Sequence, residues 1–106
     1  MEELLIWYNE HKDSLHPVEL AALFHFRFVY IHPFSDGNGR TARLLMNLIL
    51  MRNGFPPAIV KAANEARFHY YETLETASTS GDIQPFIRCI AECVEESLVR
   101  YLSTVK

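Results

Sequence analysis

Nine consecutive residues, 32–40, bring together side chains suited to chemistry on a phosphate ester: HPFSDGNGR. Gly37 and Gly39 flank Asn38, and glycine lets successive backbone N–H groups turn toward one point. The segment lies directly before a predicted helix, whose first N–H groups lack partners and carry the positive end of the helix dipole. These donors together predict a binding site for an anion such as phosphate.

Charged and titratable side chains surround this predicted anion site. Asp36 offers a ligand that suits Mg²⁺, which takes one or two carboxylates and completes its shell with phosphate oxygens and water. Arg40 and Arg43 fall in the first turns of the following helix, and a guanidinium presents paired donors matched to phosphate. His32 can accept a proton near neutral pH. The set predicts phosphoryl-type transfer, which depends mostly on positioning and charge neutralisation.

The segments on either side of this loop are predicted to be helices. No stretch shows sustained two-residue alternation with β-branched enrichment, so the expected fold class is all-α. Pro17 suits a first helical turn, Pro33 ends the helix before it, and Gly54 fits the left-handed residue that follows a helix. Five helices are expected, at about residues 2–11, 16–30, 39–53, 65–79 and 83–102.

Two of these helices are expected to be central. The second and third are apolar on almost every side, which is typical of buried helices. The loop between them would therefore be held at each end by the core, as suits a reactive loop. Residues 58–63 are expected to be extended or irregular, and Asp82 is expected to cap the last helix.

Composition narrows the class of protein. A chain of 106 residues predicts a single domain spanning 1–106, and 49% hydrophobic with 22% charged residues is ordinary for a globular protein. A net charge of −3 argues against binding nucleic acid through the overall field. No apolar run is long enough for a membrane span, so no membrane contact is expected. The acidic N-terminus speaks against a secretory signal, which makes the cytoplasm the default expectation.

Several other reactive residue types have ordinary structural interpretations. Cys89 and Cys93, four residues apart, are interpreted as small apolar side chains on one helical face rather than as a metal pair. The remaining histidines are expected at helix ends, in the core or on the surface: His11, His16, His25 and His69. Three arginines are predicted to be solvated charges: Arg27, Arg67 and Arg88.

The loop resembles the signature of Fic domains, H-P-F-x-[D/E]-G-N-[G/K]-R, at every fixed position. Eight specified positions make a chance match on the order of one in ten billion per site. Other segments resemble animal-type Fic AMP-transferases related to an endoplasmic-reticulum enzyme: residues 15–19, 30–31, 43–47, 70–71 and 81–82. The resemblance implies a Fic-type helical core that transfers AMP from ATP-Mg to a Ser, Thr or Tyr hydroxyl of a target protein.

The resemblance also implies roles for the loop. His32 would be the base that takes the proton from the target hydroxyl. Asp36 would hold Mg²⁺ or Mn²⁺. Gly37, Asn38 and Gly39 would bind the α- and β-phosphates.

Further nucleotide-binding residues are implied on two helices. Arg40 would neutralise the leaving pyrophosphate, and Thr41 would join it in binding the nucleotide. Arg43 would contact the γ-phosphate or, in restrained relatives, an inhibitory glutamate; alternatively it is a surface charge. Tyr70 and Tyr71 would border the nucleotide, or simply pack on the fourth helix.

The sequence departs from the Fic pattern in three respects. It begins just after the point where the family's β-hairpin flap should end, and no Ser or Thr is followed by Glu four residues on, as in the inhibitory helix. Ser78 stands where relatives often carry Asn. Two alternatives stay open: a catalytically weak nucleotide-binding or dimerisation module, and a toxin-type Fic protein restrained by a separate inhibitory chain.

The implied partners follow from the same resemblance. A target protein with a hydroxyl side chain is expected, and an Hsp70-class chaperone in the endoplasmic reticulum is one candidate. A homodimer is another possible assembly. Relatives also transfer UMP, phosphate or phosphocholine, and removal of AMP is a further activity, so the loop alone leaves the transferred group open.

Overall fold

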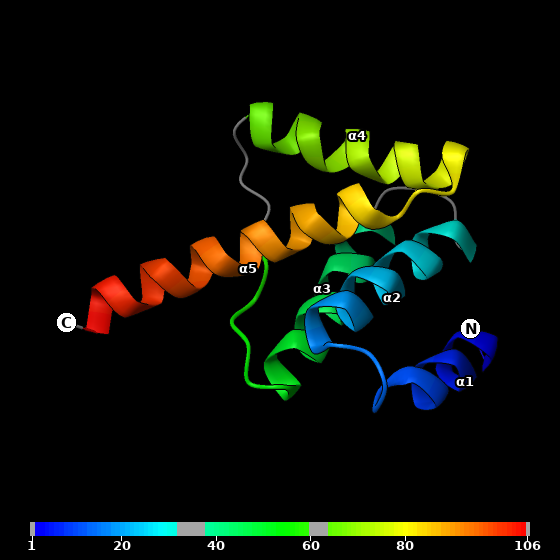
Figure 1. The fold of residues 1–106 in the computed structure, drawn as a ribbon, viewed down its shortest axis with the longest axis horizontal. Coiled ribbons are helices and arrows are strands. Elements are labelled where there is room, and N and C mark those ends of the chain that lie inside the picture. Colours follow the sequence, from blue (N-terminus) through cyan, green and yellow to red (C-terminus); the bar gives the residue numbers. More distant parts are fainter. Residues whose placement is uncertain (1, 32–37, 60–63, 106) are drawn as a thin grey trace.

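The computed structural model describes residues 2–31, 38–59 and 64–105. All regular elements within these ranges are helices, which confirms the predicted all-α class. Figure 1 shows them in chain order: α1 (Glu2–His11), α2 (Pro17–Ile31), α3 (Asn38–Arg52), α4 (Asn64–Ser80) and α5 (Gln84–Val105). Each lies within three residues of the predicted bounds. The expected irregular stretch is non-helical at residues 58–59, and the rest of it lies outside the described residues.

Helix α2 begins where the proline predicted it to begin. Pro17 is its first residue, and the preceding His16 caps the helix, because the backbone N–H of Val18 donates to His16 Nδ1 at 3.1 Å. The carbonyl of His16 also accepts the N–H of Leu20 at 2.8 Å. His16 therefore does for α2 what Ser or Asp commonly does at a helix N-terminus.

Helix α3 ends at the predicted glycine. Gly54 has a φ of 84°, in the left-handed region. Its N–H donates to the carbonyl of Met51 at 3.2 Å, and the N–H of Phe55 donates to the carbonyl of Leu50 at 2.9 Å. This pair of hydrogen bonds is the Schellman arrangement, which satisfies carbonyls at the end of a helix.

The turn between α4 and α5 also follows the sequence. Gly81 adopts a φ of 80°. Asp82 Oδ1 accepts the N–H of Gln84, the first residue of α5, at 3.2 Å, which confirms the expected capping role.

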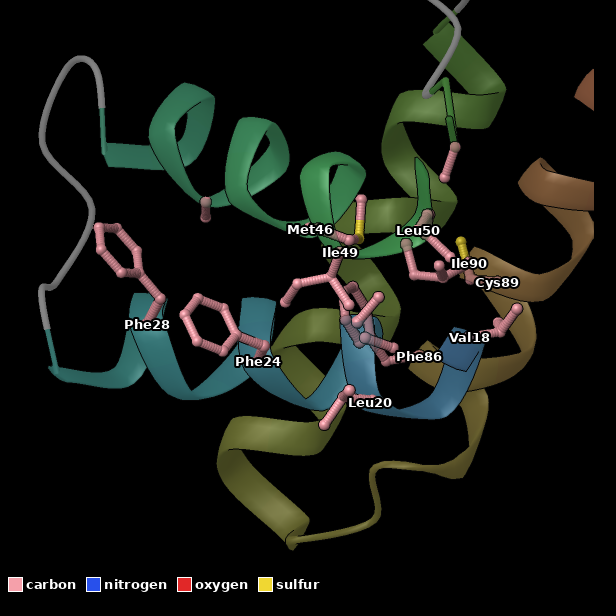
Figure 2. Packing of buried hydrophobic residues seen from close by; sticks show 14 of the residues in the cluster. Val18, Leu20, Phe24, Phe28, Met46, Ile49, Leu50, Phe86, Cys89 and Ile90 are labelled. Atoms are coloured by element: carbon pink, nitrogen blue, oxygen red, sulfur yellow. The ribbon is translucent and has the colours of Figure 1, made fainter. Parts of the chain in front are cut away.

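The core forms around α2, which packs against α1, α3 and α5. Figure 2 shows α2 and α3 side by side in opposite directions, with Phe24 and Phe28 projecting from α2 into the space between them. Phe86 of α5 is fully buried in the same cluster. Burying each large apolar side chain stabilises the fold by about 1.5–3 kcal/mol. The two helices that flank the motif loop are thus held together through much of their length.

Helix α3 is buried along one side only. Leu44, Leu48 and Met51 follow one another at helical spacing and are each more than half exposed. The expectation that α3, being apolar on almost every side, is a buried helix is therefore wrong for this face. The C-terminal half of α5 extends beyond the other helices (Figure 1), with Tyr101 and Leu102 exposed. Among the described helices, none combines the length and the apolar character needed to cross a membrane.

The cysteine pair fits its structural interpretation. Cys89 is buried in the core and Cys93 is partly buried, and both thiols are free. A hydrogen bond from Cys93 lowers the pKa of Cys89 to about 7, and the same contact raises the pKa of Cys93. The described residues contain no group of three His, Cys, Asp or Glu side chains that could hold a metal ion.

Candidate active site

The predicted catalytic loop joins α2 to α3. Three of its predicted site residues, His32, Asp36 and Gly37, lie outside the described residues. The two ends of the loop are described: α2 ends at Ile31 and α3 begins at Asn38. A helix N-terminus therefore starts inside the Gly-Asn-Gly segment, which is where the predicted anion site requires it.

The first turn of α3 contains four predicted nucleotide-binding residues. Asn38 and Gly39 contribute backbone, and the side chains of Arg40 and Thr41 are exposed. No acidic residue lies in this first turn of α3, so no carboxylate within it neutralises the positive end of the helix dipole. The turn therefore presents cationic and N–H donor groups at one end of the helix.

Arg43 lies one turn further along α3 and leans against α4. Its side chain is half buried, and its guanidinium carbon is 5.9 Å from the centre of the Tyr70 ring. A cation over an aromatic face is attracted by the ring, by about 0.5–1 kcal/mol at exposed sites and more where water is excluded. Arg43 is thus held at the boundary between α3 and α4 rather than extended into solvent.

Tyr70 is a core residue with a polar partner. Its side chain is 1% exposed, and its hydroxyl is hydrogen-bonded to His25 Nε2 of α2 at 2.5 Å. Burial raises the pKa of Tyr70 to about 12, while the neighbouring Arg43 acts in the opposite direction. Of the two alternatives for Tyr70, packing describes where most of its side chain lies.

His25 is the polar group at the centre of this arrangement. It is fully buried, its ring lies against Tyr70 and Phe86, and its Nδ1 has no hydrogen-bond partner among the described residues. Burial, and secondarily the charge of Arg43, lower the pKa of His25 to about 3. The imidazole is therefore neutral at working pH and links α2 to α4.

A small basic cavity lies between α3 and α4. It has a volume of about 70 Å³ and is lined by Arg43 of α3 and by Arg67, Tyr70 and Tyr71 of α4. Arg67 precedes the two tyrosines by three and four residues, so all three side chains share a helical face. Arg67 is exposed, as expected of a solvated charge, and it also lines this cavity, which the sequence interpretation did not anticipate. The same i, i+3, i+4 spacing in the sequence was the signal that could have revealed it.

A larger apolar cavity lies on the other side of Tyr71. Its volume is about 520 Å³, within the usual range for small-molecule sites. Its lining comes from α2 and α4: Phe26, Val29, Tyr30, Tyr71, Leu74, Glu75 and Ser78. Tyr71 lines both cavities, so it forms a wall between an apolar compartment and a basic one. Ser78, the position where Fic relatives often carry Asn, faces the apolar compartment.

Known proteins share this sequence and this arrangement of helices. The model of the Fic/DOC family matches residues 1–50. "Protein adenylyltransferase Fic" of Nematostella vectensis is 59% identical over 92 residues, which are 87% of this chain and 21% of the relative. The protein of the same name from Drosophila melanogaster is 52% identical over 103 residues, 96% of this chain and 20% of the relative. The chain belongs to the Fic/DOC family.

Solved structures carry the same Fic fold. Fic-1 from C. elegans aligns with a TM-score of 0.88 at 46% identity, over 98% of this chain and 31% of that one. A Fic domain containing signaling protein from Bacteroides thetaiotaomicron aligns with a TM-score of 0.82 at 39% identity, over 93% of this chain and 42% of that one. The expected Fic-type helical core is confirmed. The chain spans about a fifth of the length of the curated relatives that it matches.

Proposed function

We propose that this Fic chain is the catalytic core of a protein adenylyltransferase, which transfers AMP from ATP to a Ser, Thr or Tyr hydroxyl of a target protein. The observation that carries the proposal is the pair of cavities on either side of Tyr71. One compartment suits a nucleobase and the other suits phosphate. The names of the animal relatives support the same activity.

The apolar cavity is the proposed site of the adenosine. Ligand sites for small aromatic molecules are mainly apolar, with a few polar groups that fix orientation. Leu74 and the ring of Tyr71 provide the apolar surface, and Ser78 provides one hydroxyl. The base would lie between α2 and α4, on the side of Tyr71 away from the arginines.

The polyphosphate would then run along the first two turns of α3. Arg43 follows Arg40 by three residues, which places it about 4.5 Å further along the helix axis. The N-terminal N–H groups of the helix and Arg40 would bind the phosphates that become pyrophosphate. Electrostatic groups fixed in advance around developing charge are a large source of rate enhancement.

The loop residues complete the proposed mechanism. His32 would take the proton from the target hydroxyl as its oxygen attacks the α-phosphorus of ATP and the bond to pyrophosphate breaks. Mg²⁺, when bound, would neutralise charge on the phosphates, and Asp36 is the residue proposed to hold it. The lack of an acidic residue in the first turn of α3 fits this arrangement, because a carboxylate there would compete with the phosphates for the N–H donors.

The target is a protein hydroxyl, and an Hsp70-class chaperone is the proposed candidate by resemblance. Relatives that transfer UMP or phosphate make the position of the transferred label the deciding observation. ATP labelled at the α-phosphate should mark target protein, while ATP labelled at the γ-phosphate should not. Label transferred only from the γ-phosphate would contradict AMP transfer and indicate a kinase-like reaction.

A further inference from the structure

Two arginines from different helices face one small cavity. Arg43 reaches it from α3 and Arg67 from α4, and the remaining walls are the two tyrosines. Of these two arginines, the family resemblance gave a phosphate role to Arg43 and none to Arg67. It is the fold, in which α4 packs against α5, that brings Arg67 to the same cavity as Arg43.

Among the described residues, no carboxylate forms an ion pair with either arginine of this cavity. Across residues 2–31, 38–59 and 64–105, the ion pair within 4.0 Å is that between Arg100 and Glu96 on α5, and neither Arg43 nor Arg67 takes part in one. Glu75 of α4 faces the apolar cavity instead. Two like charges beside one concave space repel one another, and an anion placed between them removes that cost.

The size of the cavity limits what can enter it. A volume of about 70 Å³ is far below the roughly 300–1,000 Å³ of a site that holds a whole small molecule. That space suits a single oxyanion group and excludes a base or a sugar. A phosphate is matched by the planar paired donors of two guanidinium groups.

We propose that Arg67 is a further phosphate-binding arginine beside Arg40 and Arg43, and that it binds the terminal phosphate of ATP together with Arg43 in the cavity between α3 and α4. The inference rests on the proposed function, because it assumes that the nucleotide lies along α3. The proposal gives the site a preference among nucleotides. Arg67 contacts the third phosphate, so the chain binds ATP more tightly than ADP. AMP, which does not reach the cavity, gains nothing from Arg67.

The test measures equilibrium binding of ATP, ADP and AMP, each with Mg²⁺, by calorimetry on the 106-residue chain. Arg67→Gln removes the charge while keeping most of the side-chain length. Arg88→Gln makes the same change at an exposed position on α5 outside the cavity and is the matched control. Arg67→Lys keeps the charge but loses the paired donors.

We expect Arg67→Gln to weaken ATP binding about tenfold, which corresponds to about 1.4 kcal/mol. ADP and AMP affinities should change less than twofold, Arg67→Lys should fall between wild type and Arg67→Gln, and Arg88→Gln should match wild type. ATP binding that is unchanged in Arg67→Gln, or an equal loss for ATP and ADP, would overturn the proposal. So would a wild-type chain that binds ADP and ATP equally well.

The outcome is separable from that of the proposed activity. A chain that transfers no AMP but binds ATP in an Arg67-dependent way would refute the transferase activity and support the phosphate site. Because Arg67 is exposed, its replacement should leave the fold intact, and the far-ultraviolet circular dichroism of each variant checks this. If Arg67→Gln loses helical signal, Arg67→Lys replaces it as the test of the phosphate site. An ATP affinity of Arg67→Lys equal to that of wild type then refutes a need for paired donors at this position.

Discussion

Acid should destabilise this fold through one buried residue, His25. In the native state its pKa is lowered to about 3, because burial penalises the charged imidazole and Arg43 repels it. In the unfolded chain the same group titrates near its ordinary value of 6.5. The unfolded state therefore binds a proton first as the pH falls, and the free energy of unfolding decreases. The contribution of His25 is complete above about pH 7 and is lost progressively toward pH 3.

The size of the effect follows from the two pKa values. A pH of 5 is 1.5 units below the ordinary pKa of histidine, 6.5, and well above the native pKa of His25, about 3. Each unit corresponds to about 1.36 kcal/mol, so protonation of the unfolded chain removes about 2 kcal/mol of stability. That is a large share of the 5–15 kcal/mol typical of a folded domain.

The measurement is urea unfolding of wild type and His25→Gln at pH 7.5 and pH 5.0. Glutamine keeps a polar group that can bond the Tyr70 hydroxyl but does not titrate. Wild type should lose about 2 kcal/mol more than His25→Gln between the two pH values, because only wild type carries the titrating imidazole. Equal losses in wild type and His25→Gln would refute the account of His25 as a buried neutral group.

Three further outcomes test other parts of the structure. Tyr70→Phe removes the hydroxyl that bonds His25 and should cost about 1–3 kcal/mol, seen as a lower melting temperature; no change would contradict the buried pair. Tyr71→Ala removes a wall common to both cavities and should weaken ATP and adenosine binding together, on the order of tenfold by titration, whereas a loss for ATP alone would separate the two cavities. Gly54→Ala should cost about 1–2 kcal/mol in urea unfolding, because φ is 84° there while the added Cβ meets nothing within 4 Å; a neutral effect would mean that the turn relaxes.

Local signals in the sequence were enough to predict the helices. Proline at position 17 and glycine at positions 54 and 81 act through their own backbone restrictions, which depend little on the rest of the fold. The nine-residue motif is local as well, so its chemistry could be inferred without knowing how the helices pack. The start of α3 at Asn38 follows the same local logic.

Packing between helices was harder to predict. Tyr70 and Tyr71 are adjacent and similar, yet one is 1% exposed and the other 42% exposed. Which of them turns inward depends on His25, 45 residues away in the chain, and no local pattern contains that information. The cavity that Arg67 shares with Arg43 was missed for the same reason, since it depends on where the fold places α4.

The exposed side of α3 shows the limit of composition as a guide. Leu44, Leu48 and Met51 match a buried helix by residue type, and all three are more than half exposed. The pattern of apolar residues along a helix indicates which side of the helix can be buried favourably. Whether a neighbour covers that surface depends on the arrangement of the other helices.

The most direct test of the central claim compares AMP transfer by wild type and His32→Ala, using ATP labelled at the α-phosphate and a cell lysate as the source of targets. Wild type should label protein. His32→Ala should lose at least a hundredfold in rate, as expected when a general base is removed, while binding ATP-Mg within twofold of wild type. Full transfer by His32→Ala, or no labelled protein with the wild-type chain, would contradict the proposal that this loop catalyses the transfer of AMP.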